Sequence, residues 1–288
     1  MFSGGHAPPA PVPVDFSKIS NVLVVRPDRL GDVVLSTPVY ESLKRSFPHL
    51  KITVMVNPIQ AGVLEGNPHL HQIILMRRRR FWRAIRQSRK EKFDLAITLN
   101  KKFSATATFF TLCAGATINA GYRHSQSSWG YNIQLPVESP PCHEIQNNLA
   151  LLKHMGVPQI IQQPQIYFND GEKQKIAGII NSNKKARPLI LVKTGTRIPE
   201  WGWQWEKFQI VIEHILKNDI ADIWMINGPG EEAELESHIA RMEFKPRLLP
   251  LVKVKELALL MQQCDLLFCN HTGIMHLASA VEKPACVI

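Results

Sequence analysis

The amino-acid sequence predicts an α/β protein made of two doubly wound domains, each with a parallel sheet and crossover helices. Short apolar runs of strand length alternate with amphipathic stretches of helical length, which is the pattern of repeated βαβ units. A polar stretch, NSNKKARP at 181–188, interrupts the alternation, which then starts again. The length of 288 residues also favours two domains.

In the first half of the chain, four apolar runs predict strands and three amphipathic stretches predict helices. The predicted strands are 21–26, 51–57, 72–76 and 93–100. The predicted helices are 34–47, 81–92 and 143–157. In the last helix one face is apolar and Gly156 is expected to end it. That face consists of Ile145, Leu149, Leu152 and Met155.

The second half repeats the pattern with five strands and four helices. The predicted strands are 189–193, 221–227, 247–251, 265–270 and 284–288. The predicted helices are 205–218, 230–242, 253–263 and 273–282. Because doubly wound sheets bind ligands beyond the carboxyl ends of their strands, the segments that follow the predicted strands are the ones to search for a site.

These elements predict four regions along the chain. They are a tail at 1–18, an N-terminal domain at 19–165, a linker region at 166–187 and a C-terminal domain at 188–288. The tail is rich in Pro, Gly and Ala and lacks the regions of a signal peptide, so we expect it to be disordered or extended. The last apolar run, PACVI, has no helix after it, and we expect the second domain to be incomplete at its C-terminus.

The charge balance predicts an anionic partner. The chain has 34 Lys and Arg against 24 Asp and Glu, a net charge of +10, which favours nucleic acid, a membrane surface or an acidic substrate. No stretch reaches the roughly 18 apolar residues of a membrane-spanning helix. The five cysteines are scattered and include no CxxC, which argues against a disulfide framework or zinc site and fits a reducing cytoplasm.

The first candidate site is RPDRLGDVVLSTP, directly after the first predicted strand. Gly31 suits a tight turn, and Asp32 then lies in the first turn of a helix, where a carboxylate is favourable. One interpretation is that Asp28 or Asp32 only caps this helix. Arg26 and Arg29 place cations beside these carboxylates at the end of a strand, which favours a functional site. One glycine does not make a dinucleotide-binding fingerprint.

The second candidate site is CNHTGIMHLASA at 269–280, which follows a strand and opens a helix. The backbone N–H groups of Thr272, Gly273 and Ile274, with the Thr272 hydroxyl, are predicted to bind phosphate. His276 lies one turn further along. It either contacts the same ligand or is a buried histidine of the core.

Two more segments join strands to helices. The loop KTGTRIPEWGWQWEKF begins with a polar, basic group, Lys193, Thr194 and Arg197, which is predicted to face phosphate. The segment NGPGEEAE at 227–234 contains glycines followed by acidic residues. Turn chemistry and helix capping explain this second segment fully.

The stretch RRRRFWRAIRQSRKEK at 77–92 is strongly basic with interleaved aromatic residues. It is either a solvated helix face or a surface for an anionic bilayer, which basic amphipathic helices with aromatics favour. Nucleic acid also fits the charge, but the sequence contains no RNA- or DNA-binding motif. We therefore predict association with an anionic membrane surface and no nucleic-acid partner.

The motifs together resemble glycosyltransferase family 9, the ADP-heptose:lipopolysaccharide heptosyltransferases. The resemblance covers most of residues 20–288 and lies in five segments in the family's order. They are RPDRLGDVVLSTPV, FDLAITLN with LCAGATINAGYRH, HEIQNNLALLKHMGV, NGPGEEAEL and CNHTGIMHLASAVEKPACVI. Five ordered matches are more specific than any one of them.

The resemblance implies a GT-B fold, in which two Rossmann-like domains face a cleft. It implies inverting transfer of heptose from ADP-heptose to the lipopolysaccharide inner core, at the cytoplasmic face of the inner membrane. No metal or cofactor is implied, because the ADP-sugar is a substrate, and the acceptor is of the lipid A–Kdo type.

Residue by residue, the resemblance makes Asp32 the catalytic base, a role that a carboxylate can fill by activating an acceptor hydroxyl. Thr272, Gly273 and His276 match the family's site for the diphosphate. Five basic residues could meet the acidic sugars and phosphates of an acceptor: Arg26, Arg29, Lys101, Lys102 and Arg123. The predicted acceptor site consists of Arg26, Arg29, Gly31, Lys101, Lys102 and Arg123.

The chain departs from the family at three places. His271 stands where the family usually has Asp, Gly202 stands where it commonly has Lys or Arg, and the sequence ends after PACVI. Two other functions therefore remain open. One is a non-catalytic nucleotide-sugar-binding protein of the same family, and the other is a basic membrane-associated α/β protein without catalysis.

Overall fold

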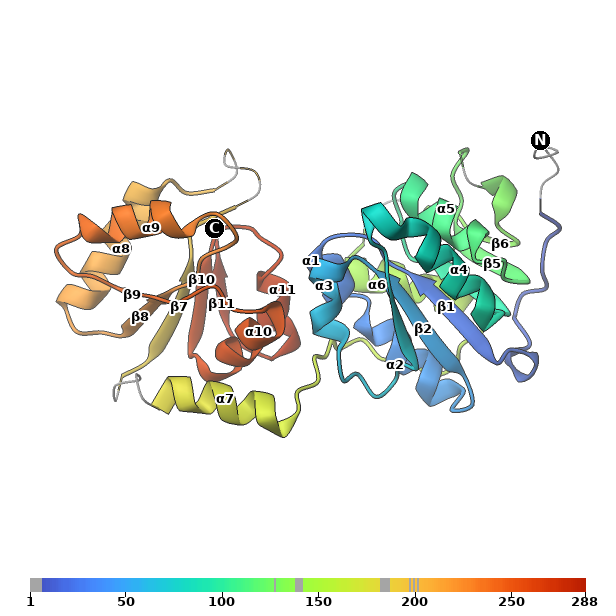
Figure 1. Ribbon diagram of the computed structural model, residues 1–288, viewed down its shortest axis with the longest axis horizontal. Coiled ribbons are helices and arrows are strands. Elements are labelled where there is room, and N and C mark those ends of the chain that lie inside the picture. Colours follow the sequence, from blue (N-terminus) through green and yellow to red (C-terminus); the bar gives the residue numbers. More distant parts are fainter. Residues whose placement is uncertain are drawn as a thin grey trace. The chain divides into compact units, whose positions relative to one another are not determined.

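The computed structural model describes residues 7–126, 128–137, 142–181, 187–196, 198, 200 and 202–288. The chain divides into two compact units, unit 1 (Met1–Tyr167) and unit 2 (Phe168–Ile288). Each is an α/β structure built on a parallel sheet (Figure 1). The predicted fold class is therefore confirmed.

Within the described residues, the sheet of unit 1 has the strand order β3-β2-β1-β4-β5-β6. Its strands are β1 (Asn21–Val25), β2 (Lys51–Val56), β3 (Gln72–Leu75), β4 (Leu95–Thr98), β5 (Ile118–Tyr122) and β6 (Ile133–Leu135). Its helices are α1 (Leu30–Val34), α2 (Thr37–Ser46), α3 (Pro58–Ala61), α4 (Phe81–Glu91), α5 (Ala105–Cys113) and α6 (Glu144–His154). The order reverses between β1 and β4, and α/β sheets bind ligands at such a switch point.

Helices cover both faces of this sheet. Leu23 and Val25 of β1 pack in one core with Ile85 of α4 and Phe110 of α5. Helices α2 and α6 pack against each other on the opposite face (Figure 1). Because β1 is buried on both faces, its sequence is a continuous apolar run rather than an alternating one.

The helix predicted at 34–47 is two helices in the structure. Helix α1 carries Asp32 in its first turn and ends at Val34, and α2 begins at Thr37. Pro38 lies in the first turn of α2, where its missing N–H is tolerated, whereas a continuous helix does not accommodate its ring. The Ser36 hydroxyl donates to the Val33 carbonyl at 2.7 Å and closes the break.

Within the described residues, the N-terminal segment from residue 7 onward is extended and contacts the rest of unit 1, as the extended alternative for 1–18 expected. Three of its backbone N–H groups donate to carbonyls elsewhere in unit 1 at 2.8 to 3.1 Å, those of Ala7, Ala10 and Val14. Phe16 is buried and stacks on Phe47 with ring centroids 4.2 Å apart. Burial of this ring ties the segment down. Residues 1–6 lie outside the described residues.

Within the described residues, the sheet of unit 2 has the order β11-β10-β7-β8-β9. Its strands are β7 (Leu189–Lys193), β8 (Asp222–Met225), β9 (Arg247–Leu248), β10 (Leu266–Cys269) and β11 (Ala285–Val287). Its helices are α7 (Asp170–Asn181), α8 (Trp205–Lys217), α9 (Glu232–Ala240), α10 (Val254–Gln263) and α11 (Met275–Ala280). The order reverses between β7 and β10, which is the switch point of this sheet.

No helix in the described part of the chain has the length and apolar character to span a bilayer.

Helix α7 occupies much of the stretch 166–187, where the sequence predicted a linker. Ile176 and Ile180 are buried one helical turn apart, and α7 packs against α10 of unit 2. The Lys255 ammonium lies 3.0 Å from the Glu172 carboxylate across this contact. The two isoleucines at a spacing of four are the pattern that identifies this helix.

Candidate active site

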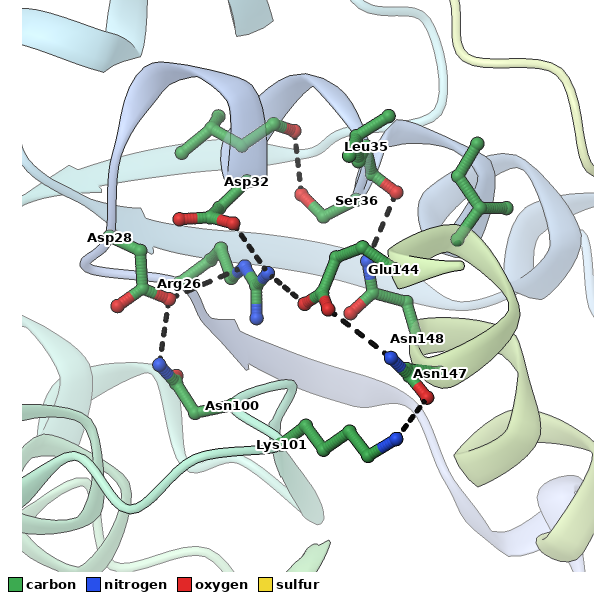
Figure 2. Close-up of polar contacts among 12 residues, drawn as sticks. Arg26, Asp28, Asp32, Leu35, Ser36, Asn100, Lys101, Glu144, Asn147 and Asn148 are labelled. Atoms are coloured by element: carbon green, nitrogen blue, oxygen red, sulfur yellow. Dashed lines mark hydrogen bonds and ion pairs between the residues drawn. The ribbon is translucent and has the colours of Figure 1, made fainter. Parts of the chain in front are cut away.

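The carboxyl end of β1 holds a charged cluster around one buried arginine. Arg26 follows β1 directly and is 2% exposed, and its guanidinium lies among three carboxylates (Figure 2). Nη2 lies 2.6 Å from Glu144 Oε1 and 3.5 Å from Asp32 Oδ1, and Nε lies 3.4 Å from Asp28 Oδ2. A buried guanidinium requires compensating charge, so this pairing explains why two aspartates stand next to the core.

Asp32, the predicted base, is held in place and remains partly open. Its Oδ2 accepts a hydrogen bond from the Arg29 backbone N–H at 3.3 Å, and its Oδ1 faces Arg26. The side chain is 34% exposed. Asp32 can therefore cap the helix and also act as a base, because the backbone hydrogen bond orients its carboxylate and leaves other lone pairs of that carboxylate free.

Asp28 is the more enclosed carboxylate of the cluster. Its Oδ2 accepts a hydrogen bond from the Asn100 side-chain amide at 2.7 Å. Burial raises the pKa of the Asp28 carboxyl, while the Arg26 charge and the Asn100 hydrogen bond act in the opposite direction. Asp28 thus serves the cluster by orienting Arg26 from the side opposite Glu144.

Sequence reasoning missed three residues of this cluster: Asn100, Glu144 and Asn147. Glu144 begins α6 and lies 118 positions from Arg26 along the chain. Its Oε2 accepts from the Asn147 amide at 3.3 Å, and the Lys101 ammonium donates to Asn147 Oδ1 at 3.1 Å (Figure 2). The available sign was the pattern HEIQNN, a carboxylate and amides placed ahead of the apolar face of a helix.

The other predicted acceptor residues lie around the same edge of unit 1. Gly31 is buried in α1, and the side chains of Arg29, Lys102 and Arg123 are exposed. Lys102 follows β4 and Arg123 follows β5, so both stand at the carboxyl edge of the sheet. The Arg26 guanidinium, also predicted to meet an acceptor, is instead buried and directed at carboxylates.

In unit 2, the predicted phosphate-facing loop begins with Lys193 at the end of β7. Lys193 is 6% exposed and forms an ion pair with Glu231, and Glu231 Oε2 also accepts from the Gly228 N–H at 2.8 Å. A Cβ at position 195 would collide with both charged groups, so Gly195 permits the pair to close. Arg197, the third basic residue predicted here, lies outside the described residues.

A pocket of about 400 Å³ opens beside this loop. Its lining combines aromatic and polar groups, and Trp205 and His238 stack there with ring centroids 4.6 Å apart. Thr194 lines it, as does the buried Asn270 that follows β10. The size and the mixed lining suit a small organic ligand with polar groups.

The segment after β10 presents unpaired donors. Among the described residues, the backbone N–H groups of Thr272, Gly273 and Ile274 and the Thr272 hydroxyl have no hydrogen-bond partner. His276 is half-buried in the first turn of α11. The Thr196 hydroxyl donates to the His271 carbonyl at 3.1 Å, which joins this segment to the β7 loop. Within the described part of the chain, Thr196 lines the pocket, whereas Thr272, Gly273, Ile274 and His276 do not.

Gly202 is tightly enclosed, and its replacement by alanine is expected to destabilise unit 2 by about 1 to 3 kcal/mol through overpacking. A Cβ there would lie 2.7 Å from Asn270 Nδ2 and 2.9 Å from Thr196 Cγ2. The Asn270 amide holds the Thr194 carbonyl and the Trp203 backbone, so it has no free direction to move. Thermal unfolding of Gly202→Ala measures this loss.

The matched control is Gly178→Ala in the middle of α7, where a Cβ would meet nothing within 4 Å. It is expected to raise stability by about 0.5 to 1 kcal/mol, because Gly costs more conformational entropy than Ala in a helix. A Gly202→Ala protein as stable as the wild type would contradict the packing described for Asn270.

The chain resembles known proteins in both sequence and fold. The family model described as glycosyltransferase family 9 (heptosyltransferase) matches residues 78–288. Lipopolysaccharide heptosyltransferase 3 of Escherichia coli is 22% identical over 268 residues, which is 88% of this chain and 78% of that protein. Lipopolysaccharide heptosyltransferase 2 of Salmonella typhimurium is 24% identical over 288 residues, 91% of this chain and 80% of that protein.

Solved structures give the same picture of the fold. A family 9 glycosyltransferase from Veillonella parvula superposes with a TM-score of 0.82 at 22% identity, covering 93% of this chain and 80% of that one. The E. coli ADP-heptose heptosyltransferase II superposes with a TM-score of 0.78 at 21% identity, with coverages of 93% and 84%. The fold is thus that of the GT-B heptosyltransferases. Because the family model matches well over half of the sequence, the chain belongs to glycosyltransferase family 9, the heptosyltransferase family, and is a glycosyltransferase.

Proposed function

We propose that this protein transfers heptose from ADP-heptose to the inner core of lipopolysaccharide with inversion and without a metal, at an anionic membrane surface on the cytoplasmic side of the inner membrane. The observation that carries the proposal is the Asp32 carboxylate, partly exposed and oriented at the switch point of unit 1 in a family 9 chain. The relatives named lipopolysaccharide heptosyltransferases support the sugar and the acceptor class.

The chemistry assigns each unit a role. Asp32 accepts the proton of an acceptor hydroxyl as its oxygen forms a bond to the anomeric carbon. The bond from that carbon to the diphosphate breaks on the opposite face, and ADP leaves with the electron pair. The acceptor is a lipid A–Kdo type molecule, and Arg29, Lys102 and Arg123 supply exposed cations for its acidic groups.

The donor is held by unit 2 in this proposal. The diphosphate needs hydrogen-bond donors as its charge develops, and the free N–H groups of Thr272, Gly273 and Ile274 supply them. The pocket beside Thr194 takes the nucleoside part. A solved E. coli heptosyltransferase structure contains ADP, which supports ADP as the nucleotide.

The deciding experiment incubates the purified protein with ADP-heptose and a lipid A–Kdo acceptor and measures product by mass spectrometry. Transfer that persists in EDTA, with product of inverted anomeric configuration by NMR, is the expected result. ADP binding by calorimetry without any transfer would overturn the proposal in favour of a non-catalytic nucleotide-sugar-binding protein. A product of retained configuration would overturn the inverting step.

The membrane surface is proposed from an aromatic–arginine patch on α4 and α5. Trp82 is 67% exposed and Phe109 is 43% exposed. Phe81 joins them, with ring centroids 4.4 Å from Trp82 and 6.4 Å from Phe109. Several arginines are close to these rings in the sequence, and two of them, Arg83 and Arg86, are exposed on α4. Aromatic rings beside cations are the chemistry of an anionic bilayer interface.

Trp82→Ala with Arg83→Glu and Arg86→Glu is expected to lower binding to phosphatidylglycerol-containing vesicles by more than about tenfold, because each basic residue contributes about 1 kcal/mol near an anionic surface. Flotation with vesicles of phosphatidylcholine alone or with phosphatidylglycerol measures it. The matched control, Ile210→Ala with Lys207→Glu on exposed positions of α8, leaves binding unchanged. Equal binding of the wild type to vesicles with and without phosphatidylglycerol would contradict the proposed anionic membrane surface.

A further inference from the structure

Glu144 and Asp32 share one nitrogen of the same arginine. Arg26 Nη2 lies 2.6 Å from Glu144 Oε1 and 3.5 Å from Asp32 Oδ1 (Figure 2). The first contact is a short, charge-assisted hydrogen bond, and the second is a longer ion pair without hydrogen-bond geometry. The guanidinium is therefore drawn toward α6 and away from α1.

The remaining contacts of Glu144 keep it in this position. Its Oε2 accepts from the neutral Asn147 amide at 3.3 Å, and the Lys101 ammonium bonds to Asn147 Oδ1 rather than to Glu144. Arg26, at 2% exposure, is enclosed and has no room to swing to solvent. The position of its charge is set by the balance between the carboxylates that face it.

We infer that Glu144 is a positioning residue for the reaction: by binding Arg26 it holds the guanidinium off Asp32, so that Asp32 remains oriented and free to take the acceptor proton. The inference rests on the proposed function of Asp32 as the base. Nothing in the capping role of an acidic residue at the start of α6 requires the contact with Arg26, because a first-turn carboxylate already suits the helix dipole.

The charged groups of the cluster around Arg26 come from several elements. Arg26 and Asp28 follow β1, Arg29 precedes α1, Glu144 begins α6, and Lys101 follows β4. Removing the charge of Glu144 leaves Arg26 with Asp32 and Asp28 as its ionic partners among the described residues. The guanidinium then moves toward Asp32, where a closer cation favours the ionised form of the carboxylate and weakens it as a proton acceptor.

The test is Glu144→Gln, which keeps the shape and removes the charge. We expect kcat for heptose transfer to fall by about 10- to 100-fold, with KM for ADP-heptose unchanged and the acidic limb of the kcat–pH profile displaced to lower pH. Glu144→Asp, which keeps the charge, restores part of kcat. The matched control is Glu41→Gln. Glu41 is a buried carboxylate of the same unit that lies outside the cluster, and its Oε1 is 2.8 Å from Arg45 Nε.

Two readouts separate the inference from the proposed function. If Glu144→Gln loses stability as Glu41→Gln does and its acidic limb does not move, Glu144 is only structural and the inference is overturned. If the wild type transfers no heptose, the proposed function fails. In that event a crystal structure of Glu144→Gln still decides the contact: an Arg26 guanidinium displaced toward Asp32 supports it, and an unmoved guanidinium overturns it.

Discussion

Asp32→Asn is expected to lower kcat for heptose transfer by about 10²- to 10⁴-fold, the range that a positioned general base contributes. Asparagine has the same shape and still offers an oxygen to the Arg29 N–H, which Asp32 binds at 3.3 Å. What it lacks is the ability to accept the acceptor's proton. KM for ADP-heptose is expected to stay within a few-fold, because we propose that unit 2 holds the donor.

The control for this prediction is Asp28→Asn, which lies on the same loop and faces the same arginine. Burial raises the pKa of the Asp28 carboxyl. One of its oxygens accepts a hydrogen bond from the Asn100 amide at 2.7 Å. Its replacement is expected to change kcat far less than that of Asp32. Steady-state kinetics on both variants tests the assignment, and equal losses in the two would contradict Asp32 as the base.

Much of the fold follows from local patterns, because most strands of the two sheets are buried on both faces. β1, β2 and β7 are apolar runs bounded by polar residues, and the predicted ranges contain them. Helix α5, ATATFFTLC, lacks a polar face and exposes Phe109, so periodicity did not identify it. Strand β6 has three residues, too few for an alternation to stand out.

The site shows a similar division between local and distant contacts. Arg26 and Asp32 lie six positions apart, and a strand end followed by a helix start brings them together in any parallel α/β sheet. Glu144 reaches the same arginine from 118 positions away. Only the tertiary fold brings the first residue of α6 to the arginine that follows β1, and single-sequence spacing does not contain that arrangement. The residues that share one guanidinium are therefore the part that required the structure.

Arg26→Met is expected to lower the stability of unit 1 by about 3 kcal/mol at neutral pH, the lower end of the loss for breaking a buried ion pair. Methionine fills a similar space, so the loss comes from charge rather than from a cavity. Three carboxylates then remain close together with their shared cation removed. Their partial exposure, 23% to 34% of each side chain, lets water relieve part of the repulsion.

The loss is expected to shrink as pH falls toward about 4, the ordinary range for aspartate. Burial raises the pKa of the Asp28 carboxyl in the folded chain, and the Arg26 charge opposes that rise. A raised carboxyl pKa favours the folded state at low pH, and this contribution is lost as pH rises through the unfolded and then the folded pKa. Without Arg26 the rise is larger, so acid recovers more stability in the variant than in the wild type.

Hydrogen exchange of peptides from β1 and β2 measures the change, and peptides from β7 and β8 in unit 2 serve as an internal reference. Arg26→Lys is expected to lie between the wild type and Arg26→Met, because an ammonium keeps the charge and loses the planar fork. Lys18→Met breaks an exposed ion pair with Asp15 and is expected to leave the exchange close to that of the wild type, because exposed ion pairs add little to stability. An Arg26→Met protein with the same exchange as the wild type at neutral pH would mean that the carboxylates of this site do not depend on Arg26, and the positioning role of Glu144 would fall with it.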